Sequence, residues 1–232
     1  MTRYFVTGTD TDAGKTLVTA GMLSLARSRG LSTLGLKPVA SGCRRTDAGL
    51  RNDDALALLA RSVPSPPYAT INPFAFEPPI APHLAARQAG VDLDLERLCA
   101  HVSPLLDEPR DLILVEGAGG WRVPLNGRDD LAGLALRLRL PVILVVGLKL
   151  GCLNHARLTA EAIRADGARL AGWVGNLLTA DFARDASCYA DNLATLQRTL
   201  GAPCLGVIPR LRVAPARRPE AAIAHLALPE GD

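Results

Sequence analysis

A loop rich in glycine, threonine and aspartate, GTDTDAGKT at residues 8–16, restricts the fold of this chain more than any other part of its sequence. The apolar run RYFVT at residues 3–7 precedes the loop and predicts a strand, and residues 16–29 follow with apolar side chains on one helical face. A loop between a strand and a helix directs the backbone N–H groups of the helix start at a bound anion. The sequence therefore predicts a phosphate-binding loop with a nucleotide as its ligand.

Individual residues of the loop have separate chemical roles in this interpretation. Gly14 has no side chain, so the backbone can approach a phosphate closely. Lys15 can reach the β- and γ-phosphates of a nucleotide, and the Thr16 hydroxyl can ligate Mg²⁺. The usual pattern G-x-x-x-x-G-K-[ST] requires glycine at position 9, where this chain has Thr9. A generic glycine-rich turn is the alternative, and the strand before and the helix after argue against it.

Strand and helix patterns alternate along the rest of the chain. We expect further strands at residues 31–37, 111–115, 141–146, 170–174 and 204–208, and further helices at residues 53–61, 93–106, 154–164 and 186–200. Residues 63–82 contain seven prolines and predict an irregular segment. The alternation predicts an α/β fold of the P-loop NTPase type, with three layers and a mostly parallel central sheet flanked by helices. We expect one domain over residues 1–232, in which residues 212–232 form a peripheral C-terminal tail.

Composition excludes several other classes of function. The net charge of +3 is small, which gives no reason to expect nucleic acid or a membrane as a partner. The five cysteines form no C-x-x-C pair, so their spacing predicts no zinc site, and their dispersed, odd number is typical of a reducing cytoplasm. No apolar run is long enough to span a bilayer.

Two carboxylates are candidates for binding magnesium. Glu116 ends the apolar run DLILV and is followed by Gly117, Ala118 and Gly119, at the end of a buried strand where α/β folds place ligand-binding groups. Asp54 lies at the start of a predicted helix, where the helix dipole alone can also explain an acid. An ordinary loop start is the alternative for Glu116. The sequence nevertheless predicts that both side chains serve the phosphate-binding loop.

The motif KPVASG at residues 37–42 follows the second predicted strand. Lys37, at the carboxyl end of that strand, can neutralise negative charge on a transferring phosphoryl group. Ser41 can hydrogen-bond a substrate. Each of these two residues, taken alone, is more often structural than catalytic.

Six motifs in one order resemble dethiobiotin synthetase. They are GTDTDAGKT at residues 8–16, KPVASG at 37–42, LRNDDALAL at 50–58, LILVEGAGGW at 112–121, PVILVVGLKLGCLNHA at 141–156 and LAGWVGN at 170–176. The resemblance extends to about Pro209. It implies an ATP-dependent ligase of biotin biosynthesis, which works as a homodimer with Mg²⁺.

The family reaction joins 7,8-diaminononanoate and CO₂. The diamine reacts with CO₂ to give a carbamate, ATP phosphorylates the carbamate, and the second amine closes a cyclic urea with release of phosphate. By position, Lys37, Lys15 and Thr11 match catalytic residues, with Lys37 stabilising the carbamate and the developing phosphoryl charge. Thr16, Asp54 and Glu116 match the metal site.

The resemblance also implies two sets of ligand-binding residues. The nucleotide and its Mg²⁺ are bound by Asp12, Ala13, Gly14, Lys15, Thr16, Leu17, Asp54, Glu116, Gly117, Ala118, Gly119, Asn176, Leu177, Pro209, Arg210 and Leu211, and Asn176 matches the position that reads adenine. The substrate is bound by Ser41 and by Gly151, Cys152, Leu153 and Asn154, which open a helix that serves the neighbouring subunit's substrate carboxylate. Cys152 then acts through its backbone.

Two departures from the family pattern affect the nucleotide site. The chain has Asp12 and Ala13 where the family usually has Glu-Val, so a side-chain contact from position 12 is one methylene shorter. Near Ala216 the family has an acid that holds the ribose, and this chain has none. We expect looser nucleotide affinity or base selectivity as a result. Strong preference for ATP over other nucleoside triphosphates would contradict this expectation.

Three other functions share the phosphate-binding loop. A partitioning-type ATPase switch carries a signature lysine five residues before the loop lysine, where this chain has Asp10. An amidoligase of the cobyrinic acid a,c-diamide type generally carries a glutaminase domain, for which this chain has no room. The third, a catalytically inactive binding protein, is disfavoured because Lys15, Lys37 and the metal-site residues are all present.

Overall fold

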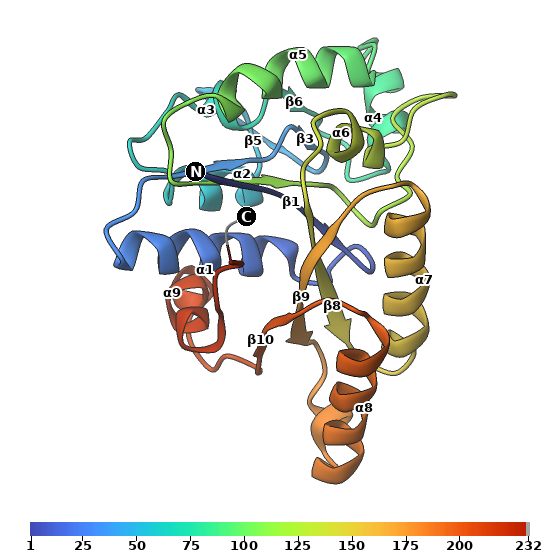
Figure 1. The fold of residues 1–232 in the computed structure, drawn as a ribbon. Helices are drawn as coiled ribbons and strands as arrows, with labels where there is room; N and C mark the ends of the chain where they lie inside the picture. Colours follow the sequence, from blue (N-terminus) through green and yellow to red (C-terminus); the bar gives the residue numbers. More distant parts are fainter. Residues whose placement is uncertain (231–232) are drawn as a thin grey trace.

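A six-stranded parallel sheet forms the centre of the computed structural model, which describes residues 1–230 (Figure 1). The strand order is β10-β9-β8-β1-β7-β2. The bounds are Thr2–Gly8 for β1, Thr33–Leu36 for β2, Leu112–Glu116 for β7, Val142–Leu148 for β8, Leu170–Leu177 for β9 and Cys204–Ile208 for β10. Neighbouring strands of this sheet pair in parallel. The P-loop α/β architecture predicted from the sequence is confirmed.

Helices cover both faces of the sheet. In Figure 1, α1 (Lys15–Ser28) lies on one side of β1, and α5 (Leu95–Leu106) and α6 (Ala132–Arg137) lie on the other. The further helices are α2 (Asp53–Leu59), α3 (Tyr68–Ile71), α4 (Pro82–Gln88), α7 (Cys152–Ala165), α8 (Ala186–Thr199) and α9 (Arg218–Ala222). α7 packs on β8, and α8 packs on α7.

The central strands are buried along almost their whole length. Every residue of β7 and β8 is buried, and both strands are runs of Leu, Ile and Val apart from Glu116 and Gly147. Such unbroken apolar runs are typical of a parallel sheet covered on both faces. The register pairs Val6 with Glu116 and Gly8 with Val145, so the carboxyl ends of β1, β7 and β8 meet at one edge. Any group that follows these strands therefore lies near the loop after β1.

Short elements lie in segments predicted to be irregular or not assigned at all. Within residues 63–82 the chain forms α3 and the two-residue strand β6 (Phe74–Ala75), which pairs with β3 (Val39–Ala40), so the prediction of an irregular segment is wrong there. β4 (Arg44–Thr46) and β5 (Gly49–Arg51) form an antiparallel hairpin. In the described part of the chain, 3₁₀ turns lie at η1 (Ala180–Ala183), η2 (Pro215–Arg217) and η3 (Ile223–His225). The pairing of β3 with β6 connects the residues that follow Lys37 to the proline-rich segment at residues 63–82.

The C-terminal segment, which the sequence predicts to be a peripheral tail, packs on α1 by means of α9. Pro219 and Ala222 of α9 are buried against α1. A Cβ atom at Gly21 would lie 2.7 Å from a side-chain atom of Leu226, so α1 and the C-terminal segment meet without intervening space. Arg61 adds an ion pair with Glu220, with an N–O distance of 2.6 Å. Residues 218–226 thus form part of the layer outside α1.

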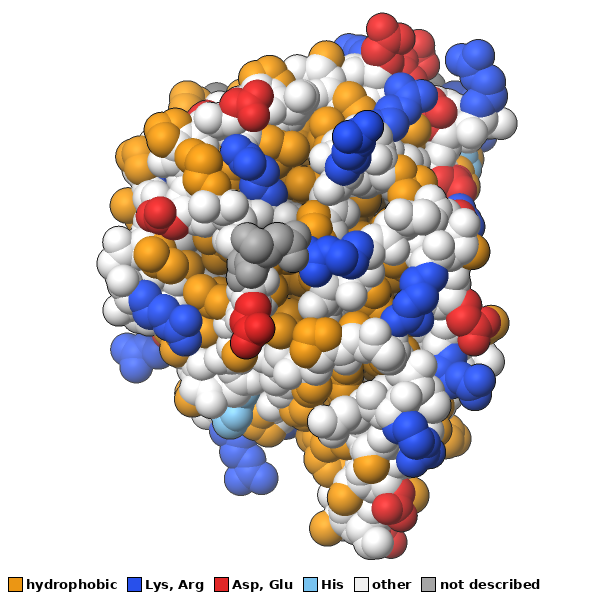
Figure 2. Space-filling view, in the orientation of Figure 1, with side chains coloured by type: hydrophobic (Ala, Val, Ile, Leu, Met, Phe, Trp, Pro, Cys, Tyr) orange, Lys and Arg blue, Asp and Glu red, His pale blue; other side chains and the backbone are white. Residues whose placement is uncertain are grey.

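The surface carries charges of both signs. Figure 2 shows Lys and Arg side chains spread over the visible face among apolar and uncharged ones. Within residues 1–230, none of the helices has the length and apolarity that a membrane crossing requires.

Candidate active site

The loop after β1 turns sharply into α1. Gly14 has φ +95° and precedes the first residue of α1, and a Cβ atom there would lie 2.1 Å from Nδ2 of Asn176. Both the positive φ and the close contact require glycine. Asp12 has φ +60°, a conformation that aspartate tolerates better than β-branched or bulky residues. The loop geometry therefore requires the motif glycine at position 14 and accommodates Asp12.

Lys15 begins α1 and is buried, with 7% of its surface exposed. Its Nζ donates to the carbonyl oxygen of Asp10 at 3.0 Å. Burial, and next the positive charge of Lys37, lower the pKa of Lys15 from 10.5 to about 8, although the nearby carboxylates oppose the shift. An anionic phosphate would supply the counter-charge that this ammonium group lacks.

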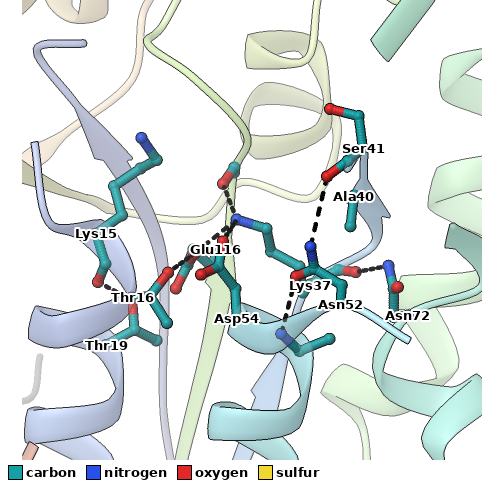
Figure 3. Close-up of polar contacts among 12 residues, drawn as sticks. Lys15, Thr16, Thr19, Lys37, Ala40, Ser41, Asn52, Asp54, Asn72 and Glu116 are labelled. Carbon is teal, nitrogen blue, oxygen red and sulfur yellow. Dashed lines mark hydrogen bonds and ion pairs between the residues drawn. The ribbon is translucent and has the colours of Figure 1, made fainter. Parts of the chain in front are cut away.

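Lys37 contacts both of the predicted metal-binding carboxylates (Figure 3). Its Nζ lies 2.6 Å from Oε1 of Glu116 and 3.2 Å from Oδ2 of Asp54, and it also donates to the carbonyl oxygen of Gly117 at 3.1 Å. Figure 3 places Thr16 on the other side of Glu116, where its hydroxyl donates to the same Oε1 at 2.7 Å. Asn72 holds the backbone of this lysine by donating to the carbonyl oxygen of Lys37 at 2.7 Å.

The charge of Lys37 follows from these contacts. Burial acts most strongly and would lower its pKa, but the charges and hydrogen bonds of Glu116 and Asp54 together raise the pKa above 10.5. Lys37 is therefore a permanent ammonium group at neutral pH. Such a group suits the stabilisation of negative charge and is unsuited to proton transfer.

Glu116 has an oxygen atom available for a cation. Its side chain is fully buried, and Oε2 has no hydrogen-bond partner among residues 1–230. Thr16 and Asp54 supply further hard oxygen atoms, of the kind that Mg²⁺ prefers. In the described part of the chain no group of three or more His, Cys, Asp or Glu side chains forms a complete metal cage. Two carboxylates and a hydroxyl fit Mg²⁺, which usually keeps waters and takes its remaining ligands from substrate phosphates.

One cavity of about 360 Å³ brings the predicted catalytic residues together with Thr16 and Asp54 of the predicted metal site. We call it the lysine cavity. Its lining residues are Thr11, Asp12, Gly14, Lys15, Thr16, Lys37, Ala40, Ser41, Asn52, Asp54, Ala118 and Gly119. They come from the loop after β1, the start of α1, the residue after β2, the end of β3, the start of α2 and the loop after β7. The predicted catalytic and metal-binding residues therefore share one space with Ser41, except that Glu116 lies beneath it.

A second, smaller cavity of about 190 Å³ contains the residues predicted to bind the base. We call it the Asn176 cavity. It is lined by Leu17, Asn176, Leu177, Leu178, Pro209, Arg210, Leu211 and Arg218. Nδ2 of Asn176 donates to the carbonyl oxygen of Ala13 at 3.0 Å, so this amide also supports the phosphate-binding loop from below. Its role in reading adenine stays a prediction.

The four residues predicted to bind the substrate carboxylate lie apart from these cavities. Gly151, Cys152, Leu153 and Asn154 form the start of α7 and line neither cavity. Cys152 is 2% exposed, and burial raises the pKa of its thiol, so its side chain is a neutral part of the core. Leu150, just before them, is 94% exposed. Within one chain, residues 151–154 are not part of the lysine cavity.

Trp121 and Asp166 connect the loop after β7 to the end of α7, a contact that the sequence did not indicate. The buried indole Nε1 of Trp121 donates to Asp166 at 2.7 Å, and Arg122 donates to the other carboxylate oxygen at 2.7 Å. Trp121 also meets Phe5 of β1 edge-to-face, with ring centroids 6.2 Å apart. A carboxylate at a helix C-terminus opposes the helix dipole, so these two donors explain its position. The contact fixes the loop that carries Gly117, Ala118 and Gly119.

Comparisons with known proteins agree with this geometry. A family model described as an AAA domain matches residues 2–217. A protein of Chromohalobacter salexigens named ATP-dependent dethiobiotin synthetase BioD is 69% identical over 234 residues, which cover 99% of each chain. The chain belongs to the dethiobiotin synthetase family. Relatives with the same printed name in Cellvibrio japonicus and Pseudomonas paraeruginosa are each 57% identical, over 97% and 98% of this chain and 95% and 97% of theirs. The resemblance seen in the six motifs is confirmed.

Solved structures of more distant proteins support the fold of this dethiobiotin synthetase family member. The MinC:MinD cell division complex of Aquifex aeolicus matches with a TM-score of 0.56 and 14% identity, over 91% of this chain and 83% of that one. A ParA family ATPase of Chlorobium tepidum matches with a TM-score of 0.56 and 15% identity, over 95% and 90%. At these identities the likeness concerns the fold alone.

Proposed function

We propose that this chain forms the ureido ring of dethiobiotin from 7,8-diaminononanoate, CO₂ and ATP, as a ligase of biotin biosynthesis that releases ADP and phosphate. The proposal rests on one observation above the others. Lys15, Lys37 and the two acids that pair with Lys37 meet beside the phosphate-binding loop, in a chain 69% identical over nearly its full length to a named dethiobiotin synthetase. This arrangement suits transfer of a phosphoryl group to a small acceptor.

Three steps balance the reaction. An uncharged amine of the diamine attacks CO₂, which forms a C–N bond and a carbamate and releases a proton. A carbamate oxygen then attacks the γ-phosphorus of ATP, and the bond from that phosphorus to the bridging oxygen breaks, so that ADP leaves. The second amine attacks the carbonyl carbon of the resulting mixed anhydride, the C–O bond to the phosphate breaks, and the cyclic urea, phosphate and a second proton are released.

The two lysines supply positive charge at different places. Lys15, at the start of α1, faces the phosphates of ATP together with the N–H groups of the loop. Lys37 extends from the end of β2 towards Glu116 and the loop after β7, and its ammonium group stabilises the carbamate and the charge on the transferring phosphoryl group. Burial lowers the pKa of Lys15 to about 8, while Glu116 and Asp54 raise that of Lys37, so both lysines carry positive charge at pH 7 and Lys15 is the one whose charge is costly before nucleotide binds.

Magnesium would be held by Thr16, Asp54 and Glu116, with phosphate oxygens. When bound, Mg²⁺ supplies charge neutralisation on the transferring phosphoryl group. The orphaned Oε2 of Glu116 supports this assignment, because a buried carboxylate oxygen without a partner is costly unless a cation or water satisfies it.

We further propose a homodimer in the cytoplasm, in which the start of α7 from one subunit holds the substrate carboxylate in the other. Residues 151–154 precede or begin a 14-residue helix whose free N–H groups suit an anion. The exposed Leu150 beside them offers an apolar surface to the diaminononanoate chain or to a second subunit. Light scattering at increasing protein concentration tests the dimer, and a monomer under assay conditions would contradict it.

Omission of single components tests the proposed function. The purified protein is mixed with ATP, Mg²⁺, bicarbonate and 7,8-diaminononanoate, each omitted in turn, and ADP and products are measured. We expect ADP release to require both the diamine and bicarbonate, with a product whose mass equals the diamine plus CO₂ minus water. ATP turnover that is independent of the diamine would overturn the substrate assignment and leave nucleotide binding in place.

A further inference from the structure

A cavity of about 690 Å³ adjoins the Asn176 cavity, and its residues Ala180, Arg212, Val213 and Arg218 have no role in the reaction described above. We call it the arginine cavity. Leu177, Ala180, Arg210, Leu211, Arg212, Val213 and Arg218 line it. Leu177, Arg210, Leu211 and Arg218 also line the Asn176 cavity, so the two spaces lie side by side around the same side chains. A ligand that occupies the Asn176 cavity can therefore extend into the arginine cavity.

The three arginines carry positive charge without a counter-charge. Within residues 1–230, Arg210, Arg212 and Arg218 form no ion pair, and no carboxylate lines the cavity. The acids nearest along the chain are already paired: Asp181 with Arg184, and Glu220 with Arg61. Guanidinium groups bind phosphate and carboxylate through parallel N–H donors, so three of them around one space suit an anionic group.

The position of this charge indicates which part of a nucleotide it would contact. The phosphates lie at the start of α1, and Leu17, two residues after Lys15, lines the Asn176 cavity, so the ribose and base lie on the side of residues 209–218. An acid in this segment would accept hydrogen bonds from ribose hydroxyls, and arginine instead accommodates a phosphate on the ribose, as in dinucleotide-binding folds. Here the described segment from Pro209 to Arg218 has four arginines and no acid.

We propose that the arginine cavity binds the ribose phosphate of an adenine nucleotide phosphorylated at its 2′ or 3′ position, in competition with ATP. The inference rests on nucleotide binding at the phosphate-binding loop. The 5′-phosphates of such a ligand lie at Lys15, and its ribose phosphate lies among the three guanidiniums. Because the ligand excludes ATP, a nucleotide of this class inhibits the enzyme.

Binding measurements with defined nucleotides test the proposal. Dissociation constants are determined by calorimetry for ADP and for its 2′-phosphate and 3′-phosphate derivatives. Each exposed charge pair contributes modestly to the free energy of binding. With three guanidiniums, we expect at least one derivative to bind about tenfold more tightly than ADP at low ionic strength. The preference falls as salt is added, because exposed charges are screened.

A pair of charge-reversal variants separates a specific site from a general positive potential. Arg212→Glu removes a guanidinium that lines only the arginine cavity, and Arg217→Glu makes the same change at an exposed neighbour outside it. We expect Arg212→Glu to abolish the tighter binding of the ribose-phosphorylated derivative, while its affinity for ADP stays within about twofold of the parent. Arg217→Glu should retain most of the tighter binding of the derivative.

The possible results are distinct. If ADP binds but neither derivative binds more tightly, the proposal is overturned and the nucleotide site stands. The proposal is also overturned if Arg212→Glu and Arg217→Glu lose the preference for the derivative over ADP to the same extent, because equal losses indicate a diffuse positive potential. If ADP itself does not bind, the nucleotide site and this inference both fail.

Discussion

Replacing Lys15 by methionine is expected to stabilise the free protein while it abolishes nucleotide binding. Lys15 is 7% exposed, and within residues 1–230 its ammonium group donates one hydrogen bond, to the carbonyl oxygen of Asp10. Its pKa falls from 10.5 to about 8, and one pKa unit corresponds to about 1.4 kcal/mol, so charging Lys15 in the folded state costs about 3 kcal/mol. Loss of the hydrogen bond to Asp10 offsets about 1 kcal/mol of the gain. We therefore expect Lys15→Met to be about 2 kcal/mol more stable at pH 7.

The pH dependence of this difference has a definite sign. The pKa of Lys15 is lower in the folded chain, so the unfolded chain binds more protons between about pH 8 and 10.5. The free-energy cost of keeping Lys15 charged in the folded chain is fully present below pH 8. It decreases as pH rises from about 8 to 10.5 and is absent above 10.5. The stability advantage of Lys15→Met is therefore largest at pH 7 and becomes small at pH 10.5.

Urea unfolding of the two proteins without nucleotide measures the difference directly. For a domain of this size, about 2 kcal/mol corresponds to a rise in Tm of about 4–8 °C. Lys149→Met is a matched control, because this lysine is 41% exposed, and its variant should lie within about 0.5 kcal/mol of the parent. The reasoning is refuted if Lys15→Met is no more stable than the parent at pH 7, or if the difference does not change between pH 7 and 10.5.

Three further substitutions examine other contacts of the site. Lys37→Leu should lower kcat at least about a hundredfold while the Kd for ATP changes little, because the interaction of Lys37 strengthens in the transition state. Turnover assays measure kcat and calorimetry measures the Kd, and equal losses in kcat and in affinity for ATP would contradict this role. Glu116→Gln should raise the Mg²⁺ concentration for half-maximal activity about tenfold, and an unchanged magnesium titration would remove Glu116 from the metal site. Asp166→Ala should lower the free energy of unfolding, measured with urea, by about 1–3 kcal/mol because it leaves the buried N–H of Trp121 unpaired. Asp166→Asn keeps an acceptor and should lower it less. Equal losses in the two variants would show that the hydrogen bond to Trp121 is unimportant.

The sequence predicted the parts of the fold that depend on local patterns. β7 and β8 are unbroken apolar runs, and burial on both faces of a parallel sheet requires that composition. The start of β10 at Cys204 and of α8 at Ala186 agree with the prediction. β9 continues to Leu177, three residues beyond the prediction, because β8 pairs with it as far as Leu148. Pairing with a neighbour is not visible in the sequence of one strand.

Short elements escaped prediction for a related reason. α3 has four residues and α6 has six, which is less than two helical turns, so neither shows an apolar period. α4 begins with Pro82, a residue that a sequence pattern assigns equally to a loop or to the first turn of a helix. Packing against longer elements decides the structure of such segments.

The chemistry of the site was predictable by residue type, and its connections were not. Lys37 and Glu116 were both candidates, but they are 79 positions apart, and their 2.6 Å contact results from β2 and β7 being neighbours in the sheet. The carbonyl contact of Asn176 and the hydrogen bond between Trp121 and Asp166 also join distant segments. Buried polar contacts of this kind depend on the whole fold.

Transfer of oxygen from bicarbonate to phosphate tests the central claim most directly. If ATP phosphorylates a carbamate, the carbamate oxygen that attacks phosphorus stays on the phosphate when the urea ring closes. With freshly prepared ¹⁸O-labelled bicarbonate, the diamine and ATP, mass spectrometry should therefore detect one labelled oxygen in each newly released phosphate. Phosphate that forms with the diamine present but carries no label would contradict phosphorylation of a carbamate in the lysine cavity.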